Sequence, residues 1–516
     1  MYRFVPVPAI IFPGLIASAI LGFLQIHRCM DPILKNALLL QEKGILTLPH
    51  GPAIESLSGA DASLYAALLF VFSLGAGLTM ASFALAFASR NLVSDHRYIL
   101  FPSLWLWAGL LFFVNQHGPV LFPSLWVLII PAITWKSTLK HMPESSIREP
   151  FFHKTMHLVP LIILTLAAMP MLSKGMFLDI RDSLLFSTRA GLAISDAYYR
   201  HTLPAAEVIK PIAARQLKLY QTDLVFSEEI IDSLKGQGWH PASPGTRPHI
   251  RIGEQKNFLT VSGSEITKTR LFWPDFESAP GHSLDKATLS GDRLKGFRGL
   301  ILYCLIPGFP LLLYIFLFST LRRILAWIFD RPAASLLASG ICLTAGLLML
   351  VPIHYLGKTE RGPQNTETLN SYLVSEKKSQ RLHAMRSAAK GKNLIISKDI
   401  LDAYLSHGSP AERYWTTAYL GARPSETNWP FLLQALKDPQ INVVCKAVEA
   451  LSLAGPVLNR NKEAQQAILE TLQTSSHPYI QWYAFMALKR LGPLPDKIKA
   501  GKVPLSFGHA LKDYRA

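Results

Sequence analysis

The chain has 516 residues, of which 50% are hydrophobic and only 17% are charged, and its formal net charge is +17. A soluble protein of this size carries nearer a quarter of charged residues. The deficit is local, because charges almost vanish from certain segments and are ordinary elsewhere, which is typical of a membrane protein. Much of the positive charge lies in short loops beside apolar segments, where Lys and Arg set orientation. We therefore expect a lipid bilayer, and no nucleic acid, as a partner.

Metal and cofactor motifs are weak throughout the chain. The four cysteines form no CxxC or CxxCH motif, which leaves metal clusters, covalent haem and a disulfide framework without support. His153 and His157 would share a helix face and, with His141 and Glu144, hold a metal, but interfacial histidines without such a role are commoner. A haem between His157 and His354 would need both side chains at matched depth. We expect no metal and no cofactor.

Seven stretches have the roughly 20 apolar residues that a helix needs to cross a membrane. The fourth is short and holds two prolines. The third and fourth share the pentapeptide FPSLW and are joined by the sequence NQHGP, which predicts a tight turn and a close helical hairpin. The seven stretches are Val5 to Ile26, Ala62 to Ser89, Tyr98 to Asn115, Pro119 to Trp135, Thr155 to Ser173, Phe297 to Leu321 and Ala333 to Leu356.

The first stretch contains the sequence Ala17-Ser18-Ala19, which resembles the cleavage site of a signal peptide. Pro13 and Gly14 interrupt its apolar core, however, and the apolar run continues to Ile26. These features favour an uncleaved helix. The topology of the remaining chain is the same in both cases.

The Lys and Arg residues of the short loops set the orientation, because cytoplasmic loops carry more of them. One alternate set of loops holds ten and the other holds three. We expect the protein in the inner membrane of a bacterium, with its N-terminus in the cytoplasm and residues 174–296 and 357–516 outside it. The ten are Arg3, Arg90, Arg97, Lys136, Lys140, Arg148, Lys154, Arg322, Arg323 and Arg331, and the three are Arg28, Lys35 and Lys43.

Small residues mark the apolar stretches, whereas ionisable residues are nearly absent from them. Small residues let helices approach closely, and an ion path would need intramembrane charges. The pattern therefore favours helix packing over transport. The small residues are Gly77, Ala81, Ala84 and Ala88 in the second stretch and Gly340, Ala345 and Gly346 in the seventh.

Residues 174–296 are too many for a connector and should fold. The first part has helical periodicity and a dense polar set that includes Asp179, Arg181, Asp182 and Arg200. Such a set beside a membrane forms either salt-bridged interfacial helices, which are the commoner case, or an active-site cleft. It is therefore the candidate site for any transport or catalysis.

The second part of this loop predicts a small α/β module of about 60 residues. Ser227 to Leu234 has the pattern of a capped short helix, because Ser227 precedes two glutamates. His249 to Gly253 and Asn257 to Val261 alternate like two strands joined by a turn. The module contains no glycine-rich phosphate loop and no nucleophile elbow.

From Glu367 onward the sequence repeats. The segment from Asn442 to Gly455 matches the segment from Tyr479 to Gly492, with equivalent residues 37 positions apart. A Pro starts one helix of each unit, small Ala residues let two helices touch, and Gly ends the turn. Two weaker units precede these, one with Arg381, Ala384 and Leu401 and one starting at Ser409-Pro410. Such units bury their apolar faces only by stacking on one another.

Residues 375–495 resemble the HEAT repeat family. The best match is Pro478, Ile480, Ala484, Ala487, Leu488, Leu491 and Gly492. The family's usual Arg is replaced by Gln481, which puts one contact between repeats in doubt. The resemblance implies an α-solenoid that binds proteins, and it implies no enzyme activity. The membrane part resembles no family.

The aromatic residues of the repeats are candidates for partner binding, although core packing explains most aromatics of this kind. Trp482, Trp415 and Trp429 are the three candidates, with Trp482 first because it follows Gln481. Exposed aromatics on a concave face would be binding hot spots.

We therefore expect a mainly α protein, with about seven transmembrane helices, a small extracytoplasmic α/β module and a C-terminal HEAT-like solenoid that binds a protein partner as a scaffold or assembly factor. The alternative is a transporter or membrane-embedded enzyme with its site between the helices and residues 179–201; enzyme activity is the less favoured case. The expected parts are helices one to five in residues 1–173, the loop domain in 174–296, helices six and seven in 297–356, the repeats in 366–495 and a basic tail in 496–516.

Overall fold

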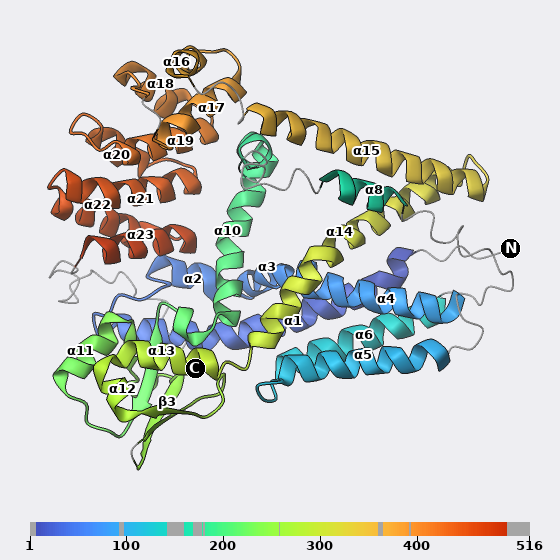
Figure 1. Ribbon diagram of the computed structural model, residues 1–516, viewed down its shortest axis with the longest axis horizontal. Helices are drawn as coiled ribbons and strands as arrows, with labels where there is room; N and C mark the ends of the chain where they lie inside the picture. Colours follow the sequence, from blue (N-terminus) through green and yellow to red (C-terminus); the bar gives the residue numbers. More distant parts are fainter. Residues whose placement is uncertain are drawn as a thin grey trace.

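The computed structural model describes residues 7–91, 97–141, 159–168, 178, 181–256, 258–359, 365–391 and 394–492. The protein is mainly helical. It consists of a bundle of long apolar helices, a small α/β module and a stack of short helices (Figure 1).

Among the residues that the structure describes, nine helical segments form the apolar bundle. The π-helical turn η1 joins α3 to α4, so that the three segments form one continuous helix. Helices α5 and α6 form the hairpin that the sequence predicted. The Asn115 side chain closes the turn of this hairpin, because it accepts a hydrogen bond from Val120 N and contacts Ser124. The segments are α1 (Val7–Gln41), α3 (Ala60–Phe70), η1 (Val71–Gly75), α4 (Ala76–Asn91), α5 (Arg97–Asn115), α6 (Leu121–His141), α8 (Val159–Ala168), α14 (Lys295–Leu325) and α15 (Arg331–Thr359).

Five helices in the described residues are long and apolar enough to cross a membrane. A sixth apolar helix, Leu100–Asn115, is shorter. The fifth stretch expected from the sequence is described only over α8, so the number seven stays a prediction. The five are Val7–Gln41, Ala60–Ser89, Leu121–His141, Lys295–Leu325 and Pro332–Val351.

The outward faces of these helices are apolar, the reverse of a water-soluble bundle. On α1, the exposed residues Phe12, Ile16, Ile20 and Leu24 recur every four residues, while the opposite side is buried. The same holds along α14 and α15, where most exposed large side chains are Leu, Ile, Phe and Met. Contiguous apolar surface of this extent marks a site of contact with lipid or protein.

Two glycines face each other where α4 crosses α14. Gly77 of α4 meets Gly308 of α14, and a Cβ added to Gly308 would lie 2.6 Å from the Gly77 Cα and 2.7 Å from its nitrogen. The predicted packing role of Gly77 is therefore seen at this crossing. Gly340 of α15 differs, because an added Cβ would have no neighbour within 4 Å.

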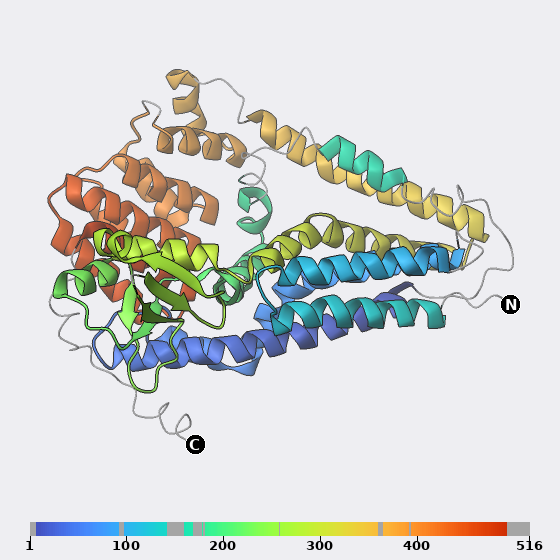
Figure 2. The ribbon, with the colours of Figure 1, turned by 60° about the horizontal axis from the view of Figure 1, so that its bottom comes forward.

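The α/β module and the short helices lie together at one end of the bundle (Figures 1 and 2). The opposite end holds the beginning of α1, the ends of α4, α6 and α14 and the beginnings of α5 and α15. Lys140, Arg322 and Arg323 belong to that opposite end, since they occupy the last turns of α6 and α14, and Lys136 lies one turn earlier in α6.

The end of helix α1 links the bundle to the α/β module. The 35 residues of α1 span about 52 Å, well beyond the apolar stretch that ends at Ile26. On this extension the Asn36 side-chain amide donates to Arg247 O at 3.0 Å and accepts from Arg247 N at 2.9 Å. One amide thus pairs with both backbone groups of a residue in the α/β module.

The α/β module is a five-stranded sheet in the order β2-β1-β3-β4-β5, covered on one face by helices. Strands β1, β2 and β3 are parallel, and β3, β4 and β5 are antiparallel. The predicted strands became β3 and β4, and the predicted helix became α11 with Ser227 as its N-cap. The elements are η5 (Ile212–Ala214), β1 (Lys218–Thr222), α11 (Glu228–Gly236), β2 (Trp239–Pro241), β3 (Ile250–Gln255), β4 (Phe258–Ser262), β5 (Thr269–Phe272), α12 (Trp273–Ser278) and α13 (Pro280–Ser290).

The C-terminal helices stack as four hairpins in two layers. The first layer is made of α17, α19, α21 and α23, which pack on one another in that order, and the second is made of α16, α18, α20 and α22. The helices are α16 (Thr366–Leu373), α17 (Lys378–Ala389), α18 (Lys398–His407), α19 (Pro410–Ala422), α20 (Trp429–Ala435), α21 (Ile441–Val457), α22 (Asn461–Thr474) and α23 (Pro478–Leu491).

The repeated Ala and Leu residues fill the core between these hairpins, as the period predicted. One detail of the prediction is wrong. Gly492 does end a helix, with φ of 101°, but Gly455 lies inside α21. Its role is close packing, because a Cβ there would lie 3.0 Å from the Cβ of Ala464 on α22.

Candidate functional site

The first layer of the repeats is covered by the chain itself. A π-helical turn, η4 (Arg181–Leu185), and the long helix α10 (Arg189–Ile209) run across it, and α10 stands upright beside the stack in Figure 1. Side chains of all four first-layer helices contact residues of η4, of α10 or of the short connection between them. For example, Lys378 of α17 contacts Ser187, and Asn442 of α21 contacts Ser195.

Asp182 is the centre of this interface. Its side chain is fully buried and receives hydrogen bonds from three residues. Arg386 of α17 donates from Nη2 at 2.6 Å and Nε at 3.2 Å, Trp415 of α19 donates from Nε1 at 2.6 Å, and Arg181 donates from Nε at 2.8 Å. A buried carboxylate is tolerated only when it is paired and hydrogen-bonded in this way. Both carboxylate oxygens are thus occupied by protein donors.

Aromatic rings hold the neighbouring arginine. The Arg181 guanidinium carbon lies 4.3 Å from the ring centre of Tyr414 and 5.1 Å from that of Phe186. Burial alone would lower the pKa of Arg181, but Asp182 and Tyr414 hold it above the ordinary value. Arg181 therefore stays charged beside Asp182, and the pair ties η4 to the repeats.

The polar cluster named from the sequence is only partly brought together. Arg181 and Asp182 are adjacent and face the repeats, whereas Arg200 lies further along α10 and pairs with Asp196, four residues earlier, at 3.6 Å. Asp179 lies outside the described residues. Arg181 and Asp182 form an ion pair with each other, and Asp182 also pairs with Arg386 of the repeats. The predicted position of this segment at the membrane surface stays a prediction.

A second group of contacts joins α10 to α23. Tyr199 stacks on Tyr479 with ring centres 4.3 Å apart, and His477 Nε2 lies 3.7 Å from an Asp196 oxygen. Burial, assisted by Arg200, lowers the pKa of His477 to about 4. The imidazole is therefore neutral near pH 7, and its Nδ1 accepts a hydrogen bond from Tyr479 N at the start of α23.

Gln481 forms a third contact, and it replaces the Arg usual in the family. The side chain is fully buried; its Oε1 accepts from His50 N at 2.8 Å and its Nε2 donates to His50 O at 2.7 Å. The loop after α1 and the short helix α2 (Pro52–Ser58) are thereby fixed to the last repeat. In the family, an Arg at this position makes a contact between repeats; here Gln481 contacts the N-terminal part of the chain.

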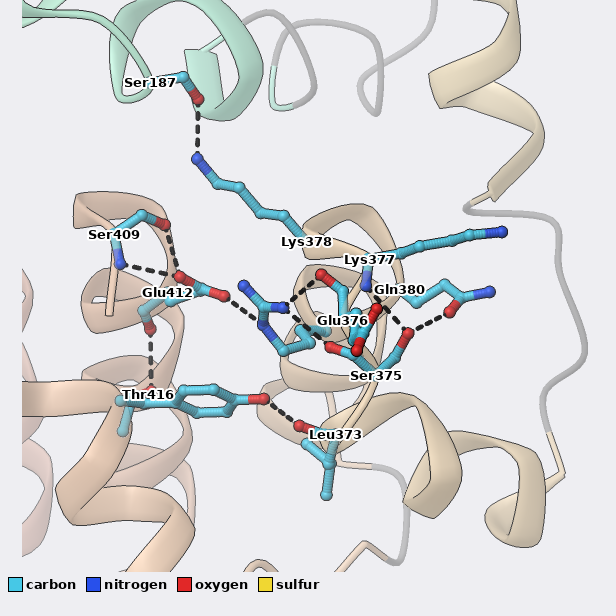
Figure 3. A network of polar contacts seen from close by, with 12 residues as sticks. Ser187, Leu373, Ser375, Glu376, Lys377, Lys378, Gln380, Ser409, Glu412 and Thr416 are labelled. Atoms are coloured by element: carbon cyan, nitrogen blue, oxygen red, sulfur yellow. Dashed lines mark hydrogen bonds and ion pairs between the residues drawn. The ribbon is translucent and has the colours of Figure 1, made fainter. Parts of the chain in front are cut away.

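Ion pairs connect the earlier repeats to one another. Arg381 of α17 donates to Glu412 of α19 at 2.7 Å, and Ser409 N and Oγ both donate to the same carboxylate (Figure 3). Burial alone would raise the pKa of Glu412, but the bonds from Ser409 and Arg381 hold it below the ordinary value. At the equivalent position in the next unit, Arg413 pairs with Asp438 at 2.6 Å.

The three tryptophans named from the sequence have different surroundings. Trp415 is 8% exposed and is bonded to Asp182, and Trp429 is 2% exposed and donates to Glu463 at 2.8 Å. Both lie in the core of the repeats. Trp482 is half-buried and packs edge-on to Tyr483, and its indole nitrogen is buried without a hydrogen-bond partner. Partner binding at Trp482 stays a prediction.

No group of three or more His, Cys, Asp or Glu side chains in the described ranges is placed to hold a metal ion. The metal site considered for His153, His157 and Glu144 lies outside those ranges. His141 ends α6, where its Nδ1 lies 2.9 Å from Ser137 O.

Paired helices stacked in two layers, with ion pairs between successive units, define the C-terminal part as a helical-repeat protein. Residues 397–489 match the family model for HEAT repeats, as the sequence resemblance predicted. HEAT repeats generally mediate protein interactions. No curated protein and no solved structure matches the chain.

Proposed function

We propose that the protein is an integral inner-membrane scaffold of a bacterium, anchored by its apolar helices, whose repeats and α/β module form one composite binding unit on the extracytoplasmic side. The observation that carries this proposal is the locking of all folded parts at one end of the apolar bundle. Arg386, Trp415 and Gln481 fix the repeats to η4 and to the loop after α1, while Asn36 fixes the α/β module to α1.

Insertion in a membrane is supported by the exposed apolar faces of α1, α14 and α15, which water would not tolerate. The orientation is supported by Lys136, Lys140, Arg322 and Arg323, which belong to the bundle end away from the repeats. An excess of Lys and Arg marks the cytoplasmic side.

A scaffold role is supported by the HEAT repeats, which generally mediate protein interactions. The internal contacts matter for how such a scaffold works. Because α10 and η4 cover the first layer, a partner meets the second layer, the edges of the stack or the α/β module. The unit offers a preformed surface, and a rigid surface loses little freedom on binding.

The alternative, a transporter or membrane-embedded enzyme with its site near residues 179–201, draws no support from Arg181 and Asp182. The Asp182 carboxylate accepts from Arg386 and Trp415 of the repeats, and the Arg181 guanidinium donates to Asp182 and lies against the Tyr414 ring. A reacting group needs free bonding capacity toward a substrate, and the oxygens of Asp182 already receive four hydrogen bonds.

The test of the scaffold proposal is quantitative capture of partners from cross-linked membranes with the tagged full chain. We expect discrete envelope proteins to be enriched with the full chain and to be lost, by about tenfold or more, with a chain that lacks residues 366–516. The control is equal membrane abundance of both chains. If the shortened chain keeps the same partners, or if the full chain enriches nothing above the tag alone, the proposal is wrong.

A further inference from the structure

One half of the sheet in the α/β module has an uncovered face. Helices α11, α12 and α13 pack on the inner face, where Ile250, Ile252, Leu259 and Val261 are buried. Side chains of alternate residues point to opposite faces of a strand. The outer face of β3, β4 and β5 therefore carries the residues between these apolar ones.

The register of the strands fixes the arrangement of that outer face. Arg251 of β3 lies opposite Ser262, and Arg270 of β5 lies opposite Thr260. Both Ser262 and Thr260 belong to β4, so the two arginines flank a middle strand with small polar side chains. Both arginines are exposed.

An aromatic pair closes one end of this face. Phe258 of β4 and Phe272 of β5 are direct partners in the register, with ring centres 5.7 Å apart. They are 41% and 47% exposed. The two rings adjoin each other, and contiguous exposed apolar surface, unlike single scattered side chains, marks a contact site.

The charged side chains on the outer face of β3, β4 and β5 are all positive. None of the outward positions of β3, β4 and β5 that the structure describes carries a carboxylate, and Glu254 belongs to the inner set because it lies opposite the buried Leu259. Arginine and aromatic residues are the types enriched in protein interfaces. Within the part of the chain that the structure describes, these two arginines face no carboxylate on the outer face. Arginines bind carboxylates with paired hydrogen bonds, so the pair fits an acidic ligand.

The position of the hairpin favours a protein partner over the membrane surface. The tip between β3 and β4 points across the long axis of the apolar bundle and does not turn back toward it (Figure 1). The first layer of the repeats is covered by α10, whereas this half of the sheet is open.

We propose that the outer face formed by Arg251, Arg270, Phe258 and Phe272 docks an acidic segment of a partner protein, one that carries Asp or Glu beside apolar side chains. This inference rests on the proposed scaffold function and gives the chemistry of the partner. The arginines bind the carboxylates, and the phenylalanine pair takes up the neighbouring apolar side chains.

The test uses the full chain in nanodiscs and a panel of fluorescent synthetic peptides in which Asp and Glu alternate with Leu and Tyr. Each peptide has a twin in which every acid is replaced by its amide. We expect the acidic peptides to bind and the amide twins to bind at least tenfold more weakly. The double variant Arg251→Gln/Arg270→Gln should lose at least tenfold in affinity for the acidic peptides, and Phe258→Ala should lose severalfold.

The matched control is Arg28→Gln/Arg189→Gln, which removes the same charge from two exposed arginines outside the face and should bind like the wild type. Equal binding by wild type and the Arg251/Arg270 variant, or absence of binding to every acidic peptide, overturns the proposal. So does flotation of the nanodiscs with phosphatidylglycerol vesicles that depends on these arginines, since lipid would then be the ligand. Partners captured equally by this variant and the wild type would refute the docking face while leaving the scaffold function intact.

Discussion

Replacing Asp182 by alanine is expected to release η4 and α10 from the repeats. The change leaves Arg386, Arg181 and the Trp415 indole without their shared acceptor in a buried interface. Removing one partner of a buried ion pair costs about 3–5 kcal/mol. We expect an equivalent loss in the free energy of unfolding in detergent, and faster hydrogen exchange in α10, α17 and α19.

A double replacement tests whether Asp182 stabilises the interface by pairing with Arg386. Asp182→Leu/Arg386→Leu removes the carboxylate together with one of its two arginine partners, so that Arg181 is the one buried charge that loses its partner. Apolar replacement of a buried ion pair is often close to neutral. The double variant should therefore be more stable than Asp182→Ala. The control is Asp232→Ala, because Asp232 pairs with Lys235 on the surface and is 77% exposed; such a pair contributes little. If Asp182→Ala and Asp232→Ala have the same stability, Asp182 does not hold the interface.

The second large effect is expected at the crossing of α4 and α14. A Cβ on Gly308 would lie 2.6 Å from the Gly77 Cα, a backbone atom that no side-chain rotation can move. Gly308→Ala must therefore push the two helices apart, and overpacking of this kind costs about 1–3 kcal/mol. The melting temperature in detergent should fall, and Gly308→Leu should lower it further.

Gly340→Ala is the matched control for this prediction. Gly340 also lies in a long apolar helix, but an added Cβ has no neighbour within 4 Å. It should leave the melting temperature unchanged or raise it slightly, since Ala favours helix more than Gly does. Similar losses in both variants would mean that α4 and α14 do not cross at these glycines.

Local features of the sequence were enough to predict many elements. The apolar stretches follow from composition, the hairpin of α5 and α6 from its turn residues, and α11 from Ser227 as its cap. The 37-residue period predicted the packing of Ala447 and Ala484, both fully buried in the repeats. Each of these signals lies within one short segment.

The contacts that join the parts were not predictable, because their partners are far apart along the chain. Asp182 and Arg386 are separated by 204 positions, and His50 and Gln481 by 431. The residues that neighbour a polar residue in the sequence do not show whether its side chain faces a substrate, water or another helix. Gln481 departs from the family pattern, which indicated an unusual contact at this position. Its partners could not be predicted, because they are the backbone N–H and C=O of His50, which any residue type would offer.

Strands β1, β2 and β5 were also missed. β1 carries Lys218 and Gln221, β2 has three residues, and β5 has four. Such short strands show no alternation of their own. Lys218 is buried in β1 only because Asp285 of α13 pairs with it at 2.8 Å, which is again a distant contact.

The most direct test of the central claim is the location of the repeats, measured with alkaline phosphatase and green fluorescent protein fused in parallel after Ala516 and after Asp330, in the turn between α14 and α15. With the repeats outside the cytoplasm, the Ala516 fusions should show active phosphatase and no fluorescence, and the Asp330 fusions the reverse. An inactive phosphatase together with a fluorescent protein after Ala516 would contradict the account, because the composite unit would then face the cytoplasm.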